Sequence, residues 1–143
     1  MSQPGRGPVV IDTSVYSARL DPRGHRLASD YRQVLEGRTT IISFITVAEM
    51  RFGAHIAGWG VRRLHRLDHE LDRAKVVWPS HNLVDHYVEL RSWCVKNGHG
   101  LGHKDHEANR WVAATAIRLG VPLVAHDAIF SGTKVLRIIS RLS

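Results

Sequence analysis

Short apolar runs alternate with helix-like segments along almost the whole chain. The runs with strand character are PVVID at 8–12, TTIISF at 39–44, VVWP at 76–79 and VPLVAHD at 121–127, with KVLRII at 134–139 as a candidate fifth. Helical patterns lie between them at 26–36, 46–57, 61–75, 82–96 and 107–119. Strands that alternate with helices join as parallel neighbours through crossovers. The pattern therefore predicts an α/β fold with a central, mostly parallel sheet.

The length of 143 residues is enough for one ordinary domain and too little for two. Residues 1–7 (MSQPGRG) are small and turn-prone, so we expect a flexible tail followed by a single domain over 8–143. The sequence has no apolar stretch long enough for a membrane span and no signal-peptide pattern. Its single cysteine excludes an internal disulfide and zinc sites that need several cysteines. We therefore expect a cytoplasmic protein that does not enter a membrane.

The charge balance points to a polyanionic partner. The chain has 20 Lys and Arg against 13 Asp and Glu, a formal net charge of +7, and ten histidines that add charge in mild acid. Such an excess favours binding to nucleic acid, although a basic surface also serves solubility alone.

Two of the predicted strands end in an aspartate. Asp12 follows PVVI, and Asp127 follows PLVAH. In parallel sheets, ligands bind outside the carboxyl ends of the strands, so these two carboxylates are candidates for one site. Each could instead be only a helix or turn cap.

Two further candidates belong to the same predicted edge. Glu49 follows the second strand at the start of a helix, although Thr46-Val-Ala-Glu49 also matches a capping box. Asn109 lies in the first turn of the helix at 107–119, four residues after Asp105, a predicted N-cap. Carboxylates gathered at one edge repel one another unless a cation neutralises them, and Mg²⁺ prefers oxygen ligands. In a basic protein, such a cluster predicts metal-assisted hydrolysis of a phosphodiester.

Three blocks of the sequence together resemble the PIN-domain ribonucleases, and more closely the VapC-type toxins of bacterial toxin–antitoxin pairs. The blocks are VVIDTSVY, SFITVAEMRFG and EANRWVAATAIRLGVPLVAHDAIF, and the resemblance extends over about residues 8 to 143. It implies a PIN-like α/β/α sandwich and an endoribonuclease that uses Mg²⁺ or Mn²⁺. It also implies a homodimer, an RNA substrate and a cognate antitoxin whose C-terminal segment enters the acidic groove.

Matched block by block, the metal-binding and catalytic positions of these toxins fall on Asp12, Glu49, Asn109 and Asp127. Asn109 departs from the pattern, because the resemblance implies an aspartate there. A neutral amide should weaken metal binding and activity. The chain is then a deliberately disabled toxin, a naturally weakened relative, or an enzyme in which Asp105 takes over the fourth position.

Other interpretations have less support in the sequence. A non-catalytic RNA-binding or regulatory protein on the same fold is the main alternative. A phospho-acceptor domain needs a second acid after Asp12, where Thr13 and Ser14 stand. The histidines around 99–106 match no tight metal motif. The four tryptophans could stack on bases but more often lie in cores or interfaces, and Cys94 fits an apolar helix stripe. Neither the RNA target nor the antitoxin can be named from the sequence.

Overall fold

The sheet contains five short strands, all parallel, in the order β3-β2-β1-β4-β5. The computed structural model describes residues 6–133 and 135–142, so most of the predicted tail and Lys134, at the start of the last predicted strand, lie outside the described residues. The strands are β1 (Val9–Ile11), β2 (Thr40–Ser43), β3 (Lys75–Val77), β4 (Leu123–Val124) and β5 (Ile138–Ile139). The predicted α/β class is confirmed, and within these residues every strand pair is parallel.

β1 lies at the centre of the sheet, between β2 and β4. Its register pairs Val9 with Thr40 on one side and Val10 with Leu123 on the other. All three of its residues are fully buried. An unbroken apolar run is what a strand covered on both faces requires.

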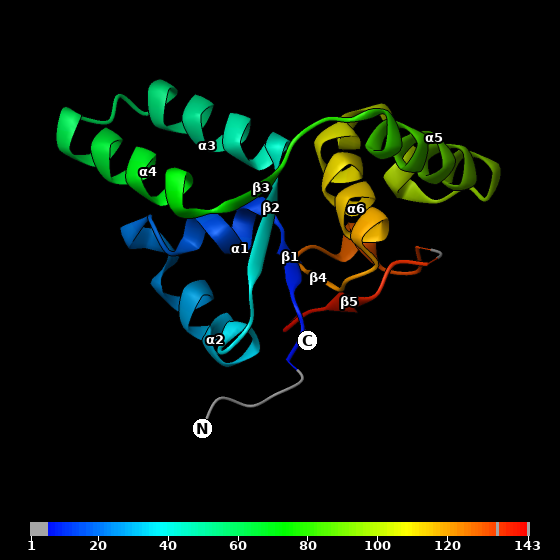
Figure 1. Ribbon diagram of the computed structural model, residues 1–143, viewed down its shortest axis with the longest axis horizontal. Coiled ribbons are helices and arrows are strands. Elements are labelled where there is room, and N and C mark those ends of the chain that lie inside the picture. The colour runs from blue at the N-terminus through cyan, green and yellow to red at the C-terminus, as the bar shows by residue number, and fades with distance from the viewer. Residues whose placement is uncertain (1–5, 134, 143) are drawn as a thin grey trace.

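Helices cover both faces of the sheet, as Figure 1 shows. On one side lie α1 (Thr13–Ala18), α2 (His25–Leu35), α3 (Phe44–Ile56) and α4 (Val61–Arg73); on the other lie α5 (His81–Lys96) and α6 (Glu107–Leu119). Short 3₁₀ turns complete the loops: η1 (Pro22–Gly24), η2 (Gly100–Gly102), η3 (Lys104–His106) and η4 (Ala128–Phe130). The architecture is an α/β/α sandwich.

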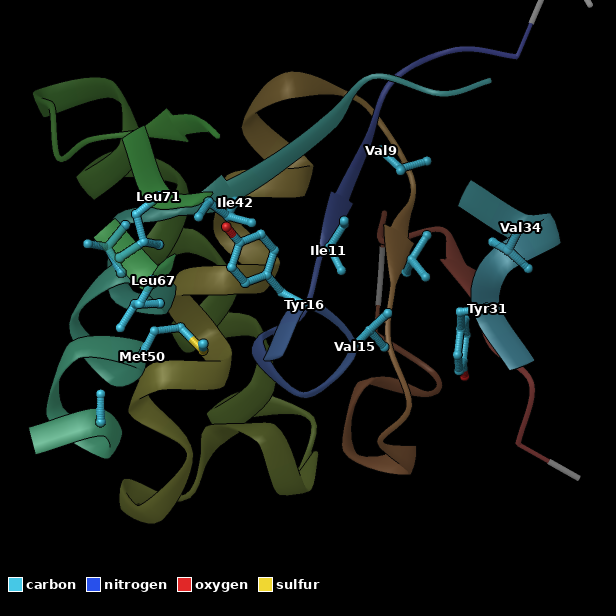
Figure 2. Packing of buried hydrophobic residues seen from close by; sticks show 13 residues of the cluster. Val9, Ile11, Val15, Tyr16, Tyr31, Val34, Ile42, Met50, Leu67 and Leu71 are labelled. Atoms are coloured by element: carbon cyan, nitrogen blue, oxygen red, sulfur yellow. The ribbon is translucent and has the colours of Figure 1, made fainter. Parts of the chain in front are cut away.

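Alternate residues of β1 point into two separate cores. Val9 and Ile11 pack with α1, α2 and α4, as Figure 2 shows for Tyr16, Tyr31 and Leu67. Val10 packs instead with residues of α5 and α6, including the buried Cys94. The sheet thus buries both faces, and its carboxyl edge remains for the polar side chains that follow the strands.

The start of α3 and the N-cap of α6 differ from the sequence prediction. α3 begins at Phe44 rather than Thr46, because Ser43 Oγ caps it by accepting from Ile45 N at 3.2 Å. The N-cap of α6 is His106, so the prediction of Asp105 as N-cap was wrong. Asp105 lies instead inside η3. The short helix α1 was not predicted, since Asp-Thr-Ser also fits a turn.

Among the described residues, no helix combines the length and apolarity needed to cross a membrane.

Candidate metal and nuclease site

Asp12 ends β1 and begins α1. Its backbone N–H donates to Val124 O of β4 at 2.9 Å, which fixes it at the carboxyl edge of the sheet. Its Oδ1 accepts from Thr13 N at 2.8 Å, and its Oδ2 accepts from Ser14 Oγ at 3.2 Å. The cap role is therefore real, but it uses only part of what two carboxylate oxygens can accept.

Burial makes the charge of Asp12 costly. The residue is 5% exposed. Loss of solvation raises the pKa of Asp12 from 3.8 to about 6; hydrogen bonds from Thr13 and Ser14 oppose this, and the nearby charges of Asp127 and Glu49 add to it. The three carboxylates are thus close enough for each charge to disfavour ionisation of Asp12. A cation at this edge would relieve that repulsion.

Glu49 is held by a chain of hydroxyl groups. Thr13 Oγ1 donates to Glu49 Oε1 at 2.7 Å, and it lies 2.8 Å from Thr46 Oγ1. Because the single hydroxyl proton of Thr13 goes to Glu49, Thr46 is the donor to Thr13. Thr46 is buried within α3 and does not cap it, so the predicted capping box was wrong. Glu49 is exposed and points toward the end of β1.

Asp127 follows β4, the strand next to β1. Its Oδ1 accepts from Ile129 N at 2.9 Å and so caps η4. The preceding residue is also fixed, because the hydroxyl of buried Tyr31 lies 2.7 Å from His126 Nδ1. That hydroxyl also donates to Ala125 O at 3.2 Å. This anchor from α2, which the sequence analysis missed, holds the backbone just before Asp127.

Asn109 lies in the first turn of α6, where its Nδ2 is 3.4 Å from His106 Nδ1. Trp111, half a turn later, packs edge-on against Phe44 at the start of α3, with ring centroids 5.4 Å apart. Both helices therefore begin at the edge where β1 and β2 end, as Figure 1 shows. Asp105, the proposed substitute, is mostly exposed and lies 3.4 Å from His103 Nδ1.

Sequence reasoning also missed Arg110, next to Asn109. Its side chain is 1% exposed. Nη1 donates to Leu101 O at 2.9 Å and to His103 O at 2.6 Å, and Nε donates to Tyr87 Oη at 3.2 Å. No carboxylate pairs with it in the described part of the chain. An arginine is usually exposed, so nothing in the sequence marked this one as an anchor for the loop before α6.

The donor set suits a hard divalent cation. Three carboxylates and one amide supply only oxygen ligands of the kind that Mg²⁺ and Mn²⁺ accept. The uncompensated charges around Asp12 also fit a cation. In this conformation, however, no three His, Cys, Asp or Glu side chains among residues 6–133 and 135–142 are grouped closely enough to hold an ion. Glu49 and Asp127 are instead hydrogen-bonded to Thr13 and to the turn after β4.

Comparisons with known proteins identify the fold and the family of the chain. The chain is 25% identical over 118 residues to Ribonuclease VapC1 of Haemophilus influenzae (strain R2866), covering 82% of this chain and 85% of that protein. VapBC2 from Rickettsia felis, solved bound to a promoter DNA fragment, superposes with a TM-score of 0.75 at 20% identity, covering 92% of this chain and 97% of that one. VapBC-1 from nontypeable H. influenzae gives 0.70 at 23% identity, covering 92% and 96%. The PIN domain family model matches residues 9–136, and the chain therefore belongs to the PIN domain family.

Proposed function

We propose that this protein is a metal-dependent endoribonuclease toxin that cleaves RNA phosphodiesters and is inhibited by a cognate antitoxin in the cytoplasm. The similarity to Ribonuclease VapC1 supports the activity. The observation that carries the proposal is geometric: the buried Asp12 ends β1 at the carboxyl edge of the sheet, with Glu49 and Asp127 close enough for their charges to act on it, on a chain with net charge +7. A basic protein gains nothing for solubility from three carboxylates placed near one another at one edge. It gains a place for a cation and for the phosphate that the cation attracts.

Asp12, Glu49, Asn109 and Asp127 are the proposed ligands and catalytic residues. A divalent ion held by them supplies positive charge that stabilises the phosphate under attack and acidifies the attacking water. Asp12 provides the central buried oxygen, since its position is fixed by β1 and by the start of α1. Thr13 orients Glu49, and the cap of η4 orients Asp127. The excess of basic side chains attracts the RNA backbone.

Asn109 weakens this site in the proposed function. Asparagine offers one neutral carbonyl oxygen, whereas aspartate at the same place adds a charge and a second oxygen. Asp105 is poorly placed to replace it, because its exposed carboxylate lies beside His103. We therefore propose that the chain binds the metal weakly and cleaves RNA slowly or not at all.

Two protein partners belong to the proposal. Structural neighbours solved as VapBC complexes support a cognate antitoxin as a partner, and we propose that it reaches the acidic edge. A homodimer is supported by the outer face of α5, where Val84, Val88 and Val95 are exposed at helical spacing. Exposed apolar side chains grouped on one helix face are typical of protein interfaces.

The test compares this chain with Asn109→Asp on total RNA, with Mg²⁺ and with EDTA. The substitution changes almost no volume, so the fold should persist. We expect Asn109→Asp to cleave RNA only with Mg²⁺, this chain to cleave far more slowly, and expression of Asn109→Asp without antitoxin to arrest growth. Adding Asp12→Ala to Asn109→Asp should remove the gained cleavage, because both residues serve one site.

Two outcomes contradict parts of the proposal. Equal cleavage by this chain and Asn109→Asp shows that Asn109 is not the weak point. If neither protein cleaves RNA but both bind it, the alternative of a non-catalytic RNA-binding protein replaces the nuclease.

A further inference from the structure

A cavity of about 270 Å³ adjoins the acidic edge and shares Thr13 and Glu49 with it. From there it extends between α1 and α3 to Asp21, Arg23, Gly53 and Trp59. Because the cavity begins at a proposed metal ligand, whatever occupies it lies next to the scissile phosphate. Its volume is slightly below the usual range of about 300–1,000 Å³ for small-molecule sites, which suits a fragment the size of one nucleotide.

Gly53 keeps the cavity open. It lies inside α3, its φ is not in the left-handed region, and a Cβ built there meets nothing within 4 Å. No turn or close backbone approach therefore requires glycine at this position. Glycine in a helix interior destabilises a protein by roughly 0.5–1 kcal/mol relative to alanine. The glycine leaves open space in the cavity that Glu49 also lines.

Cationic and aromatic groups border the same cavity. The guanidinium of Arg63 lies over the Trp59 ring, 3.8 Å from its centroid. The side chain of Arg23 is 91% exposed and pairs with Asp21 at 3.4 Å. Arg23 and, more weakly, Arg63 lower the pKa of Asp21, so both cations face this carboxylate. The cavity lining thus combines the Trp59 ring, the Arg23 guanidinium and the carboxylates of Asp21 and Glu49, and Arg63 lies beside it against Trp59.

We propose that this cavity is a subsite for one nucleotide of single-stranded RNA that flanks the cleaved bond. Bases of single-stranded RNA stack on aromatic side chains and arginine planes and use their edges for hydrogen bonds. The Trp59–Arg63 pair supplies the stacking surface, Arg23 pairs with the backbone phosphate, and Asp21 accepts from a base amino group or a ribose hydroxyl. The inference rests on the proposed function and adds where that enzyme selects its RNA sequence.

The direct test fills the cavity without touching the acids. Gly53→Leu places a side chain in open space, so the helix should form at least as well as before. His55→Leu is the matched control, since it adds the same residue on an exposed part of α3 that does not line the cavity. Binding of fluorescein-labelled RNA octamers is measured by anisotropy in EDTA at pH 8, with thermal unfolding to verify the fold.

We expect Gly53→Leu to raise the Kd for octamers by about fivefold or more, the factor that loss of one stacked base produces. His55→Leu should stay within twofold of the unchanged chain. Arg23→Gln should weaken binding and reduce the slope of log Kd against log salt by roughly 0.7, since it removes one phosphate contact. In the Asn109→Asp background, Gly53→Leu should also flatten base preference beside the cut in a random-sequence RNA.

The outcomes separate this subsite from the nuclease proposal. If a folded Gly53→Leu protein binds octamers as tightly as the unchanged chain and keeps its base preference, the subsite proposal is wrong, even if RNA is cleaved. The cavity would then be assigned to a protein partner instead. Loss of octamer binding in Gly53→Leu supports the subsite, even if no variant cleaves RNA and the nuclease proposal fails.

Discussion

The side chain of Asp12 has two roles that conflict energetically. As a cap it stabilises the start of α1, where an acceptor for a free backbone N–H contributes about 1 kcal/mol. As a buried anion beside Asp127 and Glu49 it destabilises the folded chain. An asparagine would cap equally well and carry no charge. The cap alone therefore does not account for an aspartate at this position, whereas the proposed cation does.

This conflict predicts that Asp12→Asn stabilises the metal-free protein at pH 7.5. The folded pKa of Asp12 is about 6 against 3.8 for the unfolded chain. The folded state therefore binds more protons between these values, and stability falls as the pH rises through that window. A shift of this size corresponds to ~3 kcal/mol above pH 6 as an upper value. Urea unfolding in EDTA should show the gain at pH 7.5 and none below about pH 4.

Asp30→Asn on the exposed face of α2 is the control and should leave stability unchanged at every pH. Saturating Mg²⁺ should stabilise the unchanged chain more than Asp12→Asn, through mass action on the folded state. A lower stability of Asp12→Asn in EDTA at pH 7.5 would contradict the energetic account of this residue.

Sequence reasoning placed the proposed site residues that follow buried strands at the correct edge of the sheet and missed the residues that support them. Asp12 and Asp127 were predictable because an apolar parallel strand delivers the next polar residue to one edge. Thr13 and Arg110 were not. The hydroxyl of Thr13 contacts Glu49 only because α1 and α3 pack together, which the sequence does not reveal. Arg110 is buried although arginine is usually exposed, so its residue type predicts the opposite.

At the scale of elements, α6 depends on the loop before it. Two 3₁₀ turns, η2 and η3, connect α5 to α6. The buried guanidinium of Arg110 donates hydrogen bonds to two carbonyl groups of this loop, those of Leu101 and His103. Tyr87 of α5 accepts from the same guanidinium and stacks on Trp111, with ring centroids 4.0 Å apart. The position of Asn109 is thus set by a loop, a neighbouring helix and one arginine.

Arg110→Ala should therefore destabilise the protein by roughly 2–5 kcal/mol, since it leaves a cavity and buried carbonyls without donors. Hydrogen exchange of the amides in residues 99–106 should rise more than that of the β1 amides. Arg118→Ala, on the same helix but only partly buried, is the control and should cost about 1 kcal/mol or less. Equal stability of the two variants would show that Arg110 does not anchor the loop.

The outer face of α5 gives a second prediction for a single element. Val88 is 53% exposed, with Val84 and Val95 on the same face. If this face forms the proposed homodimer, Val88→Glu should convert the protein from a dimer to a 16.1 kDa monomer in light scattering. His69→Glu adds the same charge on α4 and should leave the mass unchanged. A dimer that persists in Val88→Glu places the interface elsewhere.

Element boundaries were less predictable than element types. Each of the five predicted helices and five predicted strands exists, but α3 begins two residues early, because Ser43 caps it in spite of the strand preference of Phe44 and Ile45. The strand order was not predictable either. Hydrophobic runs indicate which strands are buried. Which strands lie side by side depends instead on how the helices that connect them pack on the sheet, and these contacts join segments far apart in the sequence.

At the scale of the whole molecule, a chain of net charge +7 carries three carboxylates near the carboxyl end of β1. The net charge of +7 attracts polyanions from a distance, whereas Asp12, Glu49 and Asp127 repel them locally. RNA should therefore bind through its backbone to the basic surface first, and the acidic edge accepts a phosphate only when a cation is present. In the proposed function, RNA affinity and RNA cleavage are consequently separable.

This separation predicts a steep salt dependence of RNA affinity that is independent of Asn109. For single strands, log Kd should rise with log salt by about 0.7 for each phosphate neutralised, so several contacts give a slope well above 1. Asn109→Asp should change the slope by much less than the 0.7 expected for one phosphate contact, because it adds one charge to a chain that already has 33 charged Lys, Arg, Asp and Glu side chains. Fluorescence anisotropy with an RNA octamer between low and moderate salt measures the slope.

A peptide nucleic acid of the same sequence, which lacks the phosphates, is the control and should bind far more weakly. If it binds as tightly as RNA, or if the RNA slope is near zero, the basic surface is not what holds the substrate.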